Sequence, residues 1–393
     1  MNPLYETMGT SVFERMSLAA TKHGAINLGQ GFPDFGWSEA IIATAAEALR
    51  GASNQYAPSR GLPALRAAVA DHYRRHQGLW VEPDHVCVTS GATEALAAAI
   101  FAVIEPGDEV IVLTPAYDAY APLIRRAGGV VREVALAPPG WRLERAALVT
   151  AMTDRTRAII LNNPHNPTGR LFDTGELAII AELAERHDLV VIADEVWEHL
   201  MLDGQRFEPF AAQCAMAGRT IKCGSAGKIF SLTGWKIGWI VAPPRLATLT
   251  ARAHQFLTFA TAPNLQAAVS EGLATGDDWL PPMRARFARA RDRMSAGLEA
   301  AGFAVLPSAS TYFLLVDLAR SGIALDDVAF ARLAVEQAGV AVIPLSAFAD
   351  HDPPRNFVRL CFAKQDATID AGVGAMNRAR ELARQAVSAT LPI

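Results

Sequence analysis

Cysteine is scarce in this sequence. The 393 residues include only four, and none stands at the paired spacing typical of a metal site: Cys87, Cys214, Cys223 and Cys361. We therefore predict no metal centre, and we expect all four to be reduced residues of the core in a cytoplasmic protein.

Long apolar runs and an excess of positive charge are missing too. The N-terminal segment lacks the continuous apolar stretch of a signal peptide, and no segment reaches the roughly 18 apolar residues of a membrane span. Lysine and arginine together number 36 against 40 acidic residues, and they are scattered along the chain, so that the formal net charge is −4. This balance argues against a nucleic-acid-binding or membrane-binding protein and favours a small-molecule ligand.

Apolar residues are plentiful, by contrast, at 51% of the chain against 19% charged residues. The chain is longer than the length at which a single core stops growing, so we expect two packed domains and an oligomer. Residues 41–275 are predicted to form a large domain and residues 276–393 a small α+β domain. Residues 1–40 are predicted to pack with the small one.

Short apolar runs alternate with helical patterns through the middle of the chain. Six runs read as strands: HVCVTS, EVIVLTP, AIILNNP, LVVIADE, TIKCGS and KIGWIVAP. This alternation predicts an α/β fold in which a mostly parallel sheet is covered by helices on both faces. Five distinctive loops follow these strands, namely SGATE, TPAYD, NNPHNPTG, DEVW and SAGK. They should meet beyond the carboxyl ends of the strands, where such sheets bind ligands.

Lys228, in CGSAGKIFSLTGWKIGW, has the most distinctive chemistry. A lysine amine forms an imine with an aldehyde most readily where desolvation keeps part of it neutral. Most lysines lie on the surface, but Lys228 follows an apolar strand and a turn of small residues. Ser225 and Lys236 lie near it in the sequence and offer the donors and the charge that a phosphate needs.

Gly91, Ala92 and Thr93 join the strand HVCVTS to a helix that begins near Glu94. Small residues at a helix N-terminus expose unpaired N–H groups and the positive end of the helix dipole, which suits a phosphate. The alternative is a tight turn in which Thr93 caps the helix.

Three further residues at strand ends suit a flat, protonated heteroaromatic ring. Asp194 ends LVVIAD, where its carboxylate can pair with a pyridine nitrogen; a helix cap or a structural ion pair is the alternative. Tyr117 can lie against such a ring or belong to the core. Asn166, in NNPHNPTG, can donate to a phenolic oxygen, although a proline-flanked turn is the ordinary reading. We assign His165 no role.

Arg359 and Tyr56 lie outside these loops. Arg359 stands in the apolar run FVRLCF, where its guanidinium can hold a substrate carboxylate through two hydrogen bonds. The alternative is an edge strand with the arginine in solvent. Tyr56, in NQYAPSRGLPALR, reads from the sequence alone as a turn tyrosine.

Taken in order, these loops resemble the class I aminotransferases of pyridoxal-phosphate fold type I, in particular the branch of the kynurenine, glutamine and methionine aminotransferases. The resemblance runs from INLGQGFPDF to FVRLCF, and SAGKIFSLTGWKIGW is its most specific motif. It implies a mostly parallel seven-stranded sheet between helices, a smaller α+β domain, and pyridoxal 5′-phosphate as cofactor.

The resemblance also implies a role for each residue. Lys228 is expected to hold the cofactor as an internal aldimine, and Asp194 to pair with its ring nitrogen. Tyr117 stacks on the ring, Asn166 binds the ring oxygen and contacts the substrate, and Arg359 grips the substrate carboxylate. The phosphate is held by the following residues: Gly91, Ala92, Thr93, Ser225 and Lys236.

Two more roles concern the surroundings of the site. Tyr56 is expected to reach the phosphate from the neighbouring subunit, which implies a homodimer with shared active sites. Gly31, in GQGFPDF, is expected to belong to the segment that closes over the substrate.

The chain departs from the family pattern at Trp197. DEVW stands where family members usually read DEVY, so that an indole replaces a phenol beside the cofactor. An indole N–H can donate a hydrogen bond but cannot accept one or ionise. HQFLTFATAPNLQ does not clearly keep the aromatic and histidine pair of the kynurenine-type pocket, where Phe259 is only a candidate.

The implied function is an aminotransferase that moves the amino group of an L-amino acid to a 2-oxo acid by a ping-pong mechanism. Phe35, Trp37 and Trp197 favour a methionine, glutamine, aromatic or kynurenine-like donor, because a dicarboxylate needs a second cation. An interface core is the alternative for Phe35 and Trp37. A carbon–sulfur β-lyase using the same cofactor is the competing enzyme, whereas a DNA-binding regulator is disfavoured because no basic helix-turn-helix segment precedes the core.

Overall fold

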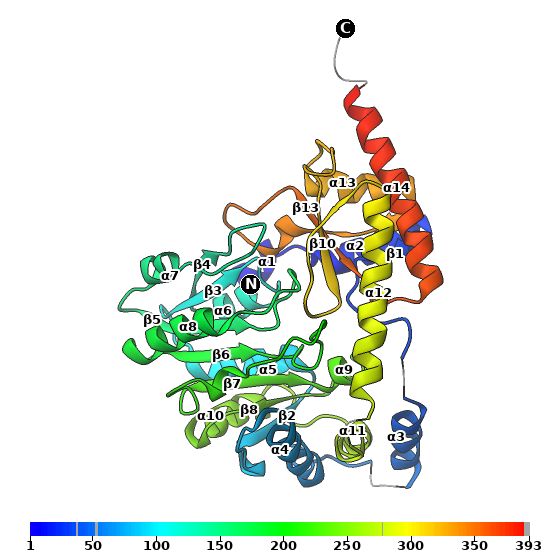
Figure 1. The fold of residues 1–393 in the computed structure, drawn as a ribbon. Helices are drawn as coiled ribbons and strands as arrows, with labels where there is room; N and C mark the ends of the chain where they lie inside the picture. Colours follow the sequence, from blue (N-terminus) through cyan, green and yellow to red (C-terminus); the bar gives the residue numbers. More distant parts are fainter. Residues whose placement is uncertain (37, 52–53, 277, 389–393) are drawn as a thin grey trace.

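The computed structural model describes residues 1–36, 38–51, 54–276 and 278–388. Trp37, a predicted substrate contact, lies outside the described residues. The larger of the three sheets has seven strands, in the order β2-β8-β7-β6-β5-β3-β4 (Figure 1). Their bounds are β2 Val86–Thr89, β3 Glu109–Thr114, β4 Val130–Ala135, β5 Thr156–Asn162, β6 Val190–Asp194, β7 Thr220–Ser225 and β8 Gly238–Val241.

Neighbouring strands of this sheet are parallel except at β8, which runs antiparallel to both β2 and β7. The predicted mostly parallel seven-stranded sheet is thus confirmed. The six runs proposed from the sequence all form strands. The seventh, β4, was not identified because it lies at the edge of the sheet and its residues VVREVA are mostly half-buried or exposed.

Alternate residues of the central strands enter two different cores, which is why these strands are apolar throughout. Ile111 and Ile159 pack with α8 on one face, whereas Val110 and Ile160 pack with α5 and α10 on the other. The helices associated with this sheet are α4 Pro63–Gln77, α5 Ala92–Val103, α6 Tyr120–Arg126, α7 Arg145–Ala151, α8 Thr174–Arg186, α9 Ala226–Ile229, α10 Pro244–Gln255 and α11 Pro263–Ala274. Helix α3 (Glu39–Gly51) packs on α11.

A second, antiparallel sheet has the order β12-β13-β10-β9. Its strands are β9 Ala304–Val305, β10 Phe313–Asp317, β12 Ile343–Pro344 and β13 Phe357–Cys361. Around it lie α12 Leu280–Ala300, α13 Asp327–Leu333 and α14 Asp366–Ser388, with α12 running alongside α14 (Figure 1). The single run VAVIPL divides between two sheets, because β11 (Val340–Ala341) pairs in parallel with β1 (Ile26–Asn27) instead of joining β12.

The N-terminal residues form α1 (Pro3–Thr7), α2 (Val12–His23) and β1, and α2 contacts the β11 region. Short helical turns lie at Pro83–His85, Phe210–Ala212, Thr233–Trp235, Ala334–Ala338 and Leu345–Phe348. The exact division of the chain at residues 40 and 275 stays a prediction.

One expectation about the cysteines is wrong. Cys87, Cys223 and Cys361 are buried, as proposed, but Cys214 is exposed. It lies in the irregular stretch before β7, outside the apolar strand runs.

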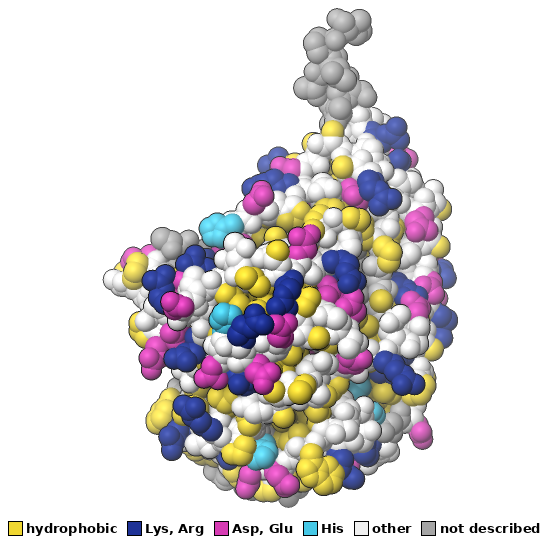
Figure 2. Space-filling view, turned by 60° about the vertical axis from the view of Figure 1, so that its left-hand side comes forward, with side chains coloured by type: hydrophobic (Ala, Val, Ile, Leu, Met, Phe, Trp, Pro, Cys, Tyr) yellow, Lys and Arg dark blue, Asp and Glu magenta, His cyan; other side chains and the backbone are white. Residues whose placement is uncertain are grey.

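The charges on the surface are mixed in sign, as the nearly balanced numbers of basic and acidic residues predict. Figure 2 shows basic and acidic side chains interspersed over one face of the molecule. Among the described residues, every helix is too short or too polar to cross a bilayer.

Gly224 in β7 lies in close contact with two buried side chains, and the packing of the large sheet depends on this contact. It pairs with Trp239 of β8, whose side chain is fully buried. A Cβ at Gly224 would collide with Trp239 Nε1 and lie 2.6 Å from Tyr73 Oη.

Gly224→Ala is therefore expected to lower the free energy of unfolding by about 2 kcal/mol, because an added methyl group must displace two buried side chains. Chemical denaturation would measure this. Gly218→Ala is the matched control, since a Cβ there meets nothing within 4 Å. Equal stability of the two variants would contradict the packing described.

Candidate active site

A cavity of about 210 Å³ lies at the carboxyl ends of the central strands. Every residue predicted to bind the cofactor lines it, with the exception of Tyr56: Gly91, Ala92, Thr93, Tyr117, Asn166, Asp194, Trp197, Ser225, Lys228 and Lys236. The parallel register places Asp194 beside Cys223, two residues before Ser225. The crevice expected from the strand-end loops is therefore present.

Lys228 reaches this cavity from α9, the short helix that follows β7. Its Nζ lies 3.1 Å from Tyr312 Oη and 4.6 Å from the centre of the Trp197 ring. Burial lowers the pKa of Lys228 to about 8, because the ammonium is poorly solvated there. A substantial fraction of the amine is then neutral near physiological pH, as addition to a carbonyl requires.

Another part of the cavity lining, formed by Gly91, Ala92, Thr93 and Lys236, suits a phosphate. Gly91 has φ +78° and precedes α5, so that the first N–H groups of this helix face the cavity. A Cβ at Gly91 would lie 3.0 Å from Lys236 Nζ, so this side chain lies directly against the turn. No capping hydrogen bond from a side chain is present at the start of α5, so the alternative in which Thr93 caps the helix is excluded.

Asp194 is 4% exposed, at the end of β6. Its Oδ2 accepts a hydrogen bond from Tyr120 at 2.5 Å, and its Oδ1 accepts one from the Val196 N–H at 3.4 Å. Burial raises the pKa of Asp194, and these two hydrogen bonds only partly oppose the effect. A cationic partner in the cavity would stabilise the carboxylate.

Arg359 lies in β13, between β12 and β10, and is 1% exposed. The alternative of a solvent-facing arginine on an edge strand is therefore excluded. The guanidinium donates to Asn166 Oδ1 and to the Gly29 carbonyl, both at 2.8 Å. Within the described part of the chain, its buried Nε has no hydrogen-bond partner. Burial lowers the pKa of Arg359 to about 10, so an anion placed here would be strongly favoured.

Aromatic rings surround this guanidinium. Its central carbon lies 3.8 Å from the centre of the Phe313 ring, 5.0 Å from that of Phe13 and 5.2 Å from that of Phe348. The side chains around the charge are therefore mainly apolar.

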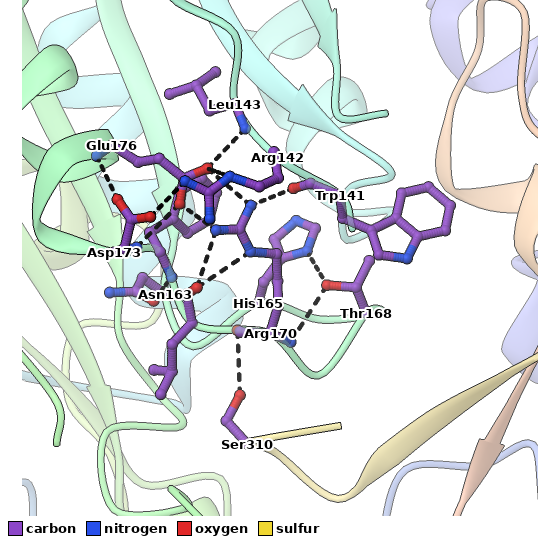
Figure 3. Close-up of polar contacts among 12 residues, drawn as sticks. Trp141, Arg142, Leu143, Asn163, His165, Thr168, Arg170, Asp173, Glu176 and Ser310 are labelled. Carbon is purple, nitrogen blue, oxygen red and sulfur yellow. Dashed lines mark hydrogen bonds and ion pairs between the residues drawn. The ribbon is translucent and has the colours of Figure 1, made fainter. Parts of the chain in front are cut away.

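The loop that carries Asn166 is braced from behind by a polar cluster (Figure 3). Arg170 forms an ion pair with Glu176, whose carboxylate also completes the capping box of α8 with Asp173. His165 Nδ1 lies 2.7 Å from Thr168 Oγ1 inside the same loop. Burial lowers the pKa of His165 to about 3, so the ring is neutral.

Gly31 and Tyr56 lie at the margins of the site. The Gly31 carbonyl accepts a hydrogen bond from Tyr312 at 2.6 Å, so the GQGFPDF segment does reach the neighbourhood of Lys228. Tyr56 is 86% exposed and makes an edge-on contact with Phe259. It does not line the cavity of its own chain.

Two residues of the site were missed from the sequence, Tyr120 and Tyr312. Tyr120 lies three residues after Tyr117, and their rings meet edge-on with centres 5.7 Å apart, but Tyr117 precedes α6 and no helical pattern marked the pair. Tyr312 precedes the apolar strand β10, where a tyrosine next to Phe313 reads as an ordinary core residue. Nothing in the sequence marks its hydroxyl as facing Lys228.

Residues 23–376 match the model of a family described as aminotransferase class I and II. The chain belongs to this family. It is 44% identical to a probable N-succinyldiaminopimelate aminotransferase of Mycobacterium tuberculosis, over 93% of this chain and 94% of that protein. It is 38% identical to the methionine aminotransferase of Escherichia coli, over 95% and 96% of the two chains. A solved structure of the M. tuberculosis N-succinyldiaminopimelate aminotransferase superimposes with a TM-score of 0.93 at 43% identity, covering 96% of this chain and 99% of that one.

The protein is accordingly a pyridoxal-phosphate-dependent aminotransferase. The residues of the cavity fit this cofactor. A helix N-terminus with Ser225 and Lys236 suits its phosphate, a buried carboxylate suits its ring nitrogen, and a partly neutral amine suits its aldehyde.

Tyr120→Phe tests the Asp194 contact. Loss of one donor to a buried carboxylate is expected to raise the pKa of Asp194 further, so that less of it is ionised. Affinity for pyridoxal phosphate at neutral pH should fall about tenfold, and the loss should shrink as the pH rises. Fluorescence titration measures this.

Tyr73→Phe is the matched control, because it also removes a buried phenol, one that contacts Glu198 and Trp239. A Tyr120→Phe variant with unchanged cofactor affinity at every pH would show that the contact does not support Asp194.

Proposed function

We propose that this protein moves the amino group of a methionine, glutamine, aromatic or kynurenine-like L-amino acid to a 2-oxo acid, and that it works in the cytoplasm. The observation that carries the proposal is a cavity that holds the half-buried amine of Lys228 and the buried carboxylate of Asp194. The buried guanidinium of Arg359 donates a hydrogen bond to Asn166 in the lining of this cavity. The aromatic rings around Arg359 support a donor with an uncharged side chain.

When bound, pyridoxal phosphate supplies an aldehyde for the substrate amine and a ring that withdraws electrons from the α-carbon. Asp194 is suited to keep the ring nitrogen protonated, Tyr117 to lie on the ring, and Asn166 to donate to its oxygen. The phosphate is assigned to the following groups: the N–H groups of Gly91 to Thr93, Ser225 and Lys236.

Lys228 is the proposed base. Its neutral amine would take the proton from the α-carbon of the substrate and, as the ammonium, would later give a proton back on the cofactor side. Arg359 holds the α-carboxylate, which fixes the orientation of the carbon–hydrogen bond. Because the first oxo acid leaves before the second binds, the kinetics should be ping-pong.

A panel of amino donors against several 2-oxo acids tests this function. Methionine, glutamine, phenylalanine and kynurenine should give parallel double-reciprocal plots, whereas aspartate should be at least tenfold poorer, because it brings a second carboxylate to an aromatic pocket. N-succinyldiaminopimelate belongs in the panel because a relative is named for it. Strong preference for a dicarboxylate would overturn the proposed donor class.

Two controls separate the alternatives. Lys228→Ala should show neither turnover nor the visible absorbance band of the cofactor joined to this lysine as an imine. Pyruvate and ammonia released from cystathionine without any oxo acid would instead favour the β-lyase.

We also propose a homodimer with shared sites. Tyr56 and Phe259 contact each other, and both are exposed, as are the neighbouring Phe256 and Leu257. An exposed aromatic group of this kind favours burial against a second copy of the chain. Tyr56 would then reach the phosphate site of its partner.

Hybrid dimers test this sharing. Lys228→Ala and Tyr56→Ala chains are purified separately and then mixed under conditions that exchange subunits. Each hybrid would contain one site with both native residues, so about a quarter of all sites would be native and activity should exceed the mean of the parents. Activity equal to that mean, in a mixture shown to contain hybrids, would contradict shared sites.

A further inference from the structure

The hydroxyl of Tyr312 lies between the amine of Lys228 and the backbone of Gly31. Lys228 Nζ is 3.1 Å from Tyr312 Oη, and Tyr312 Oη is 2.6 Å from the Gly31 carbonyl oxygen. The tyrosine is 1% exposed. Three groups from distant parts of the sequence thus form one chain of hydrogen bonds.

The direction of these hydrogen bonds is fixed by chemistry. A carbonyl oxygen can only accept, so the single O–H of Tyr312 is directed to Gly31. What Tyr312 then offers Lys228 is an oxygen lone pair, and Lys228 must donate an N–H to it. In its neutral form, the amine therefore keeps its own lone pair free on another side.

Packing holds the phenol in this position. The Tyr312 ring stands edge-on to the Trp197 ring, with centres 4.5 Å apart, and it also packs against Phe313 and Phe287. Gly31 has no room for a side chain, because a Cβ there would lie 2.7 Å from Phe313 Cζ. The carbonyl of Gly31 can approach Tyr312 closely because this residue is glycine.

We propose that Tyr312 is a catalytic residue that orients the Lys228 amine. The position of the Gly31 segment sets the direction of the Tyr312 O–H, and this direction decides whether the lone pair of the amine is free. With Gly31 in place, the O–H is held away from Lys228 and the lone pair of the amine is free. When Gly31 moves away, the O–H turns to Lys228 and caps that lone pair. The proposal rests on the proposed role of Lys228 as the reacting amine.

The charged and titratable groups around Lys228 bear on its test. Burial is the largest influence on the pKa of Lys228 and lowers it; Cys361 and Asp194 raise this pKa, whereas Arg359 and Lys236 lower it further. Burial also raises the pKa of Tyr312 well above its usual range, so the phenol stays protonated. Tyr312 is therefore a neutral partner that supports the ammonium form by accepting from it.

Tyr312→Phe removes the hydroxyl and keeps the ring. The pKa of Lys228 should fall below its value of about 8 in the full chain freed of cofactor, because the ammonium loses an acceptor. The measurement is the pH dependence of acetic anhydride labelling, read at each lysine by mass spectrometry. The chain has only five lysines, Lys22, Lys222, Lys228, Lys236 and Lys364, so the Lys228 peptide is easily resolved.

In the holoenzyme, the same variant should lower kcat roughly tenfold with little change in KM, and raise the isotope effect with an α-deuterated donor. Tyr73→Phe is the control for loss of a buried phenol, and it should leave the Lys228 labelling curve unchanged. An unchanged curve in Tyr312→Phe would overturn the proposal.

Gly31→Ala tests the control by the loop. The methyl group collides with the Phe313 ring and must displace the segment, including the carbonyl that accepts from Tyr312. Lys228 labelling above its pKa should therefore slow several-fold. In a Gly31→Ala and Tyr312→Phe double variant this slowing should vanish, since no O–H remains to cap the amine. Equal slowing in both backgrounds would overturn the control by Gly31.

Failure of the proposed function has a separate signature. Pyridoxal phosphate should protect Lys228 from labelling in the native chain. Absence of that protection would refute the role of Lys228 itself, whatever Tyr312 does.

Discussion

Desolvation at the carboxyl edge of the large sheet is the constraint on which the rest of the site depends. Asp194 and Arg359 are buried and Lys228 is half-buried there, and burial raises the pKa of the acid while it lowers the pKa of the two bases. Each group is left in need of a ligand that carries the complementary charge or reactivity. The fold thus keeps these groups poorly solvated until a cofactor and a substrate carboxylate bind to them.

The segments that carry these site residues must be rigid to hold them in place. The Asn166 loop is anchored through Arg170 and Glu176. Behind the turn that carries Trp197, the buried Lys222 of β7 pairs with Glu195 and with Glu198. These ion pairs lie outside the cavity, and each fixes a segment on which a residue of the site stands. A rigid scaffold of this kind is what allows small reorientations, such as that proposed for the Tyr312 hydroxyl, to have a chemical effect.

Much of this was readable from the sequence, for a physical reason. Strands buried on both faces are continuous apolar runs, and the polar residue that ends each run must lie at the sheet edge, so Asp194 and the turn before Lys228 were placed correctly. The edge strand β4 was missed because exposure of its residues weakens that pattern. Tyr312 was missed because its proposed role depends on a contact with Gly31, 281 residues away, which no local pattern reports.

Arginine supplies nearly all the positive charge of this protein, since only five of its 36 basic residues are lysines. A guanidinium keeps its proton at every physiological pH and therefore does not add to aldehydes. Of the lysines, Lys222 is buried in ion pairs and Lys364 is buried with its Nζ on the Phe32 carbonyl. The two other lysines are the exposed Lys22 and Lys236, which lines the same cavity. An aldehyde that meets this chain thus has few amines to react with, and this scarcity adds to the selectivity that the pocket gives the amine at Lys228.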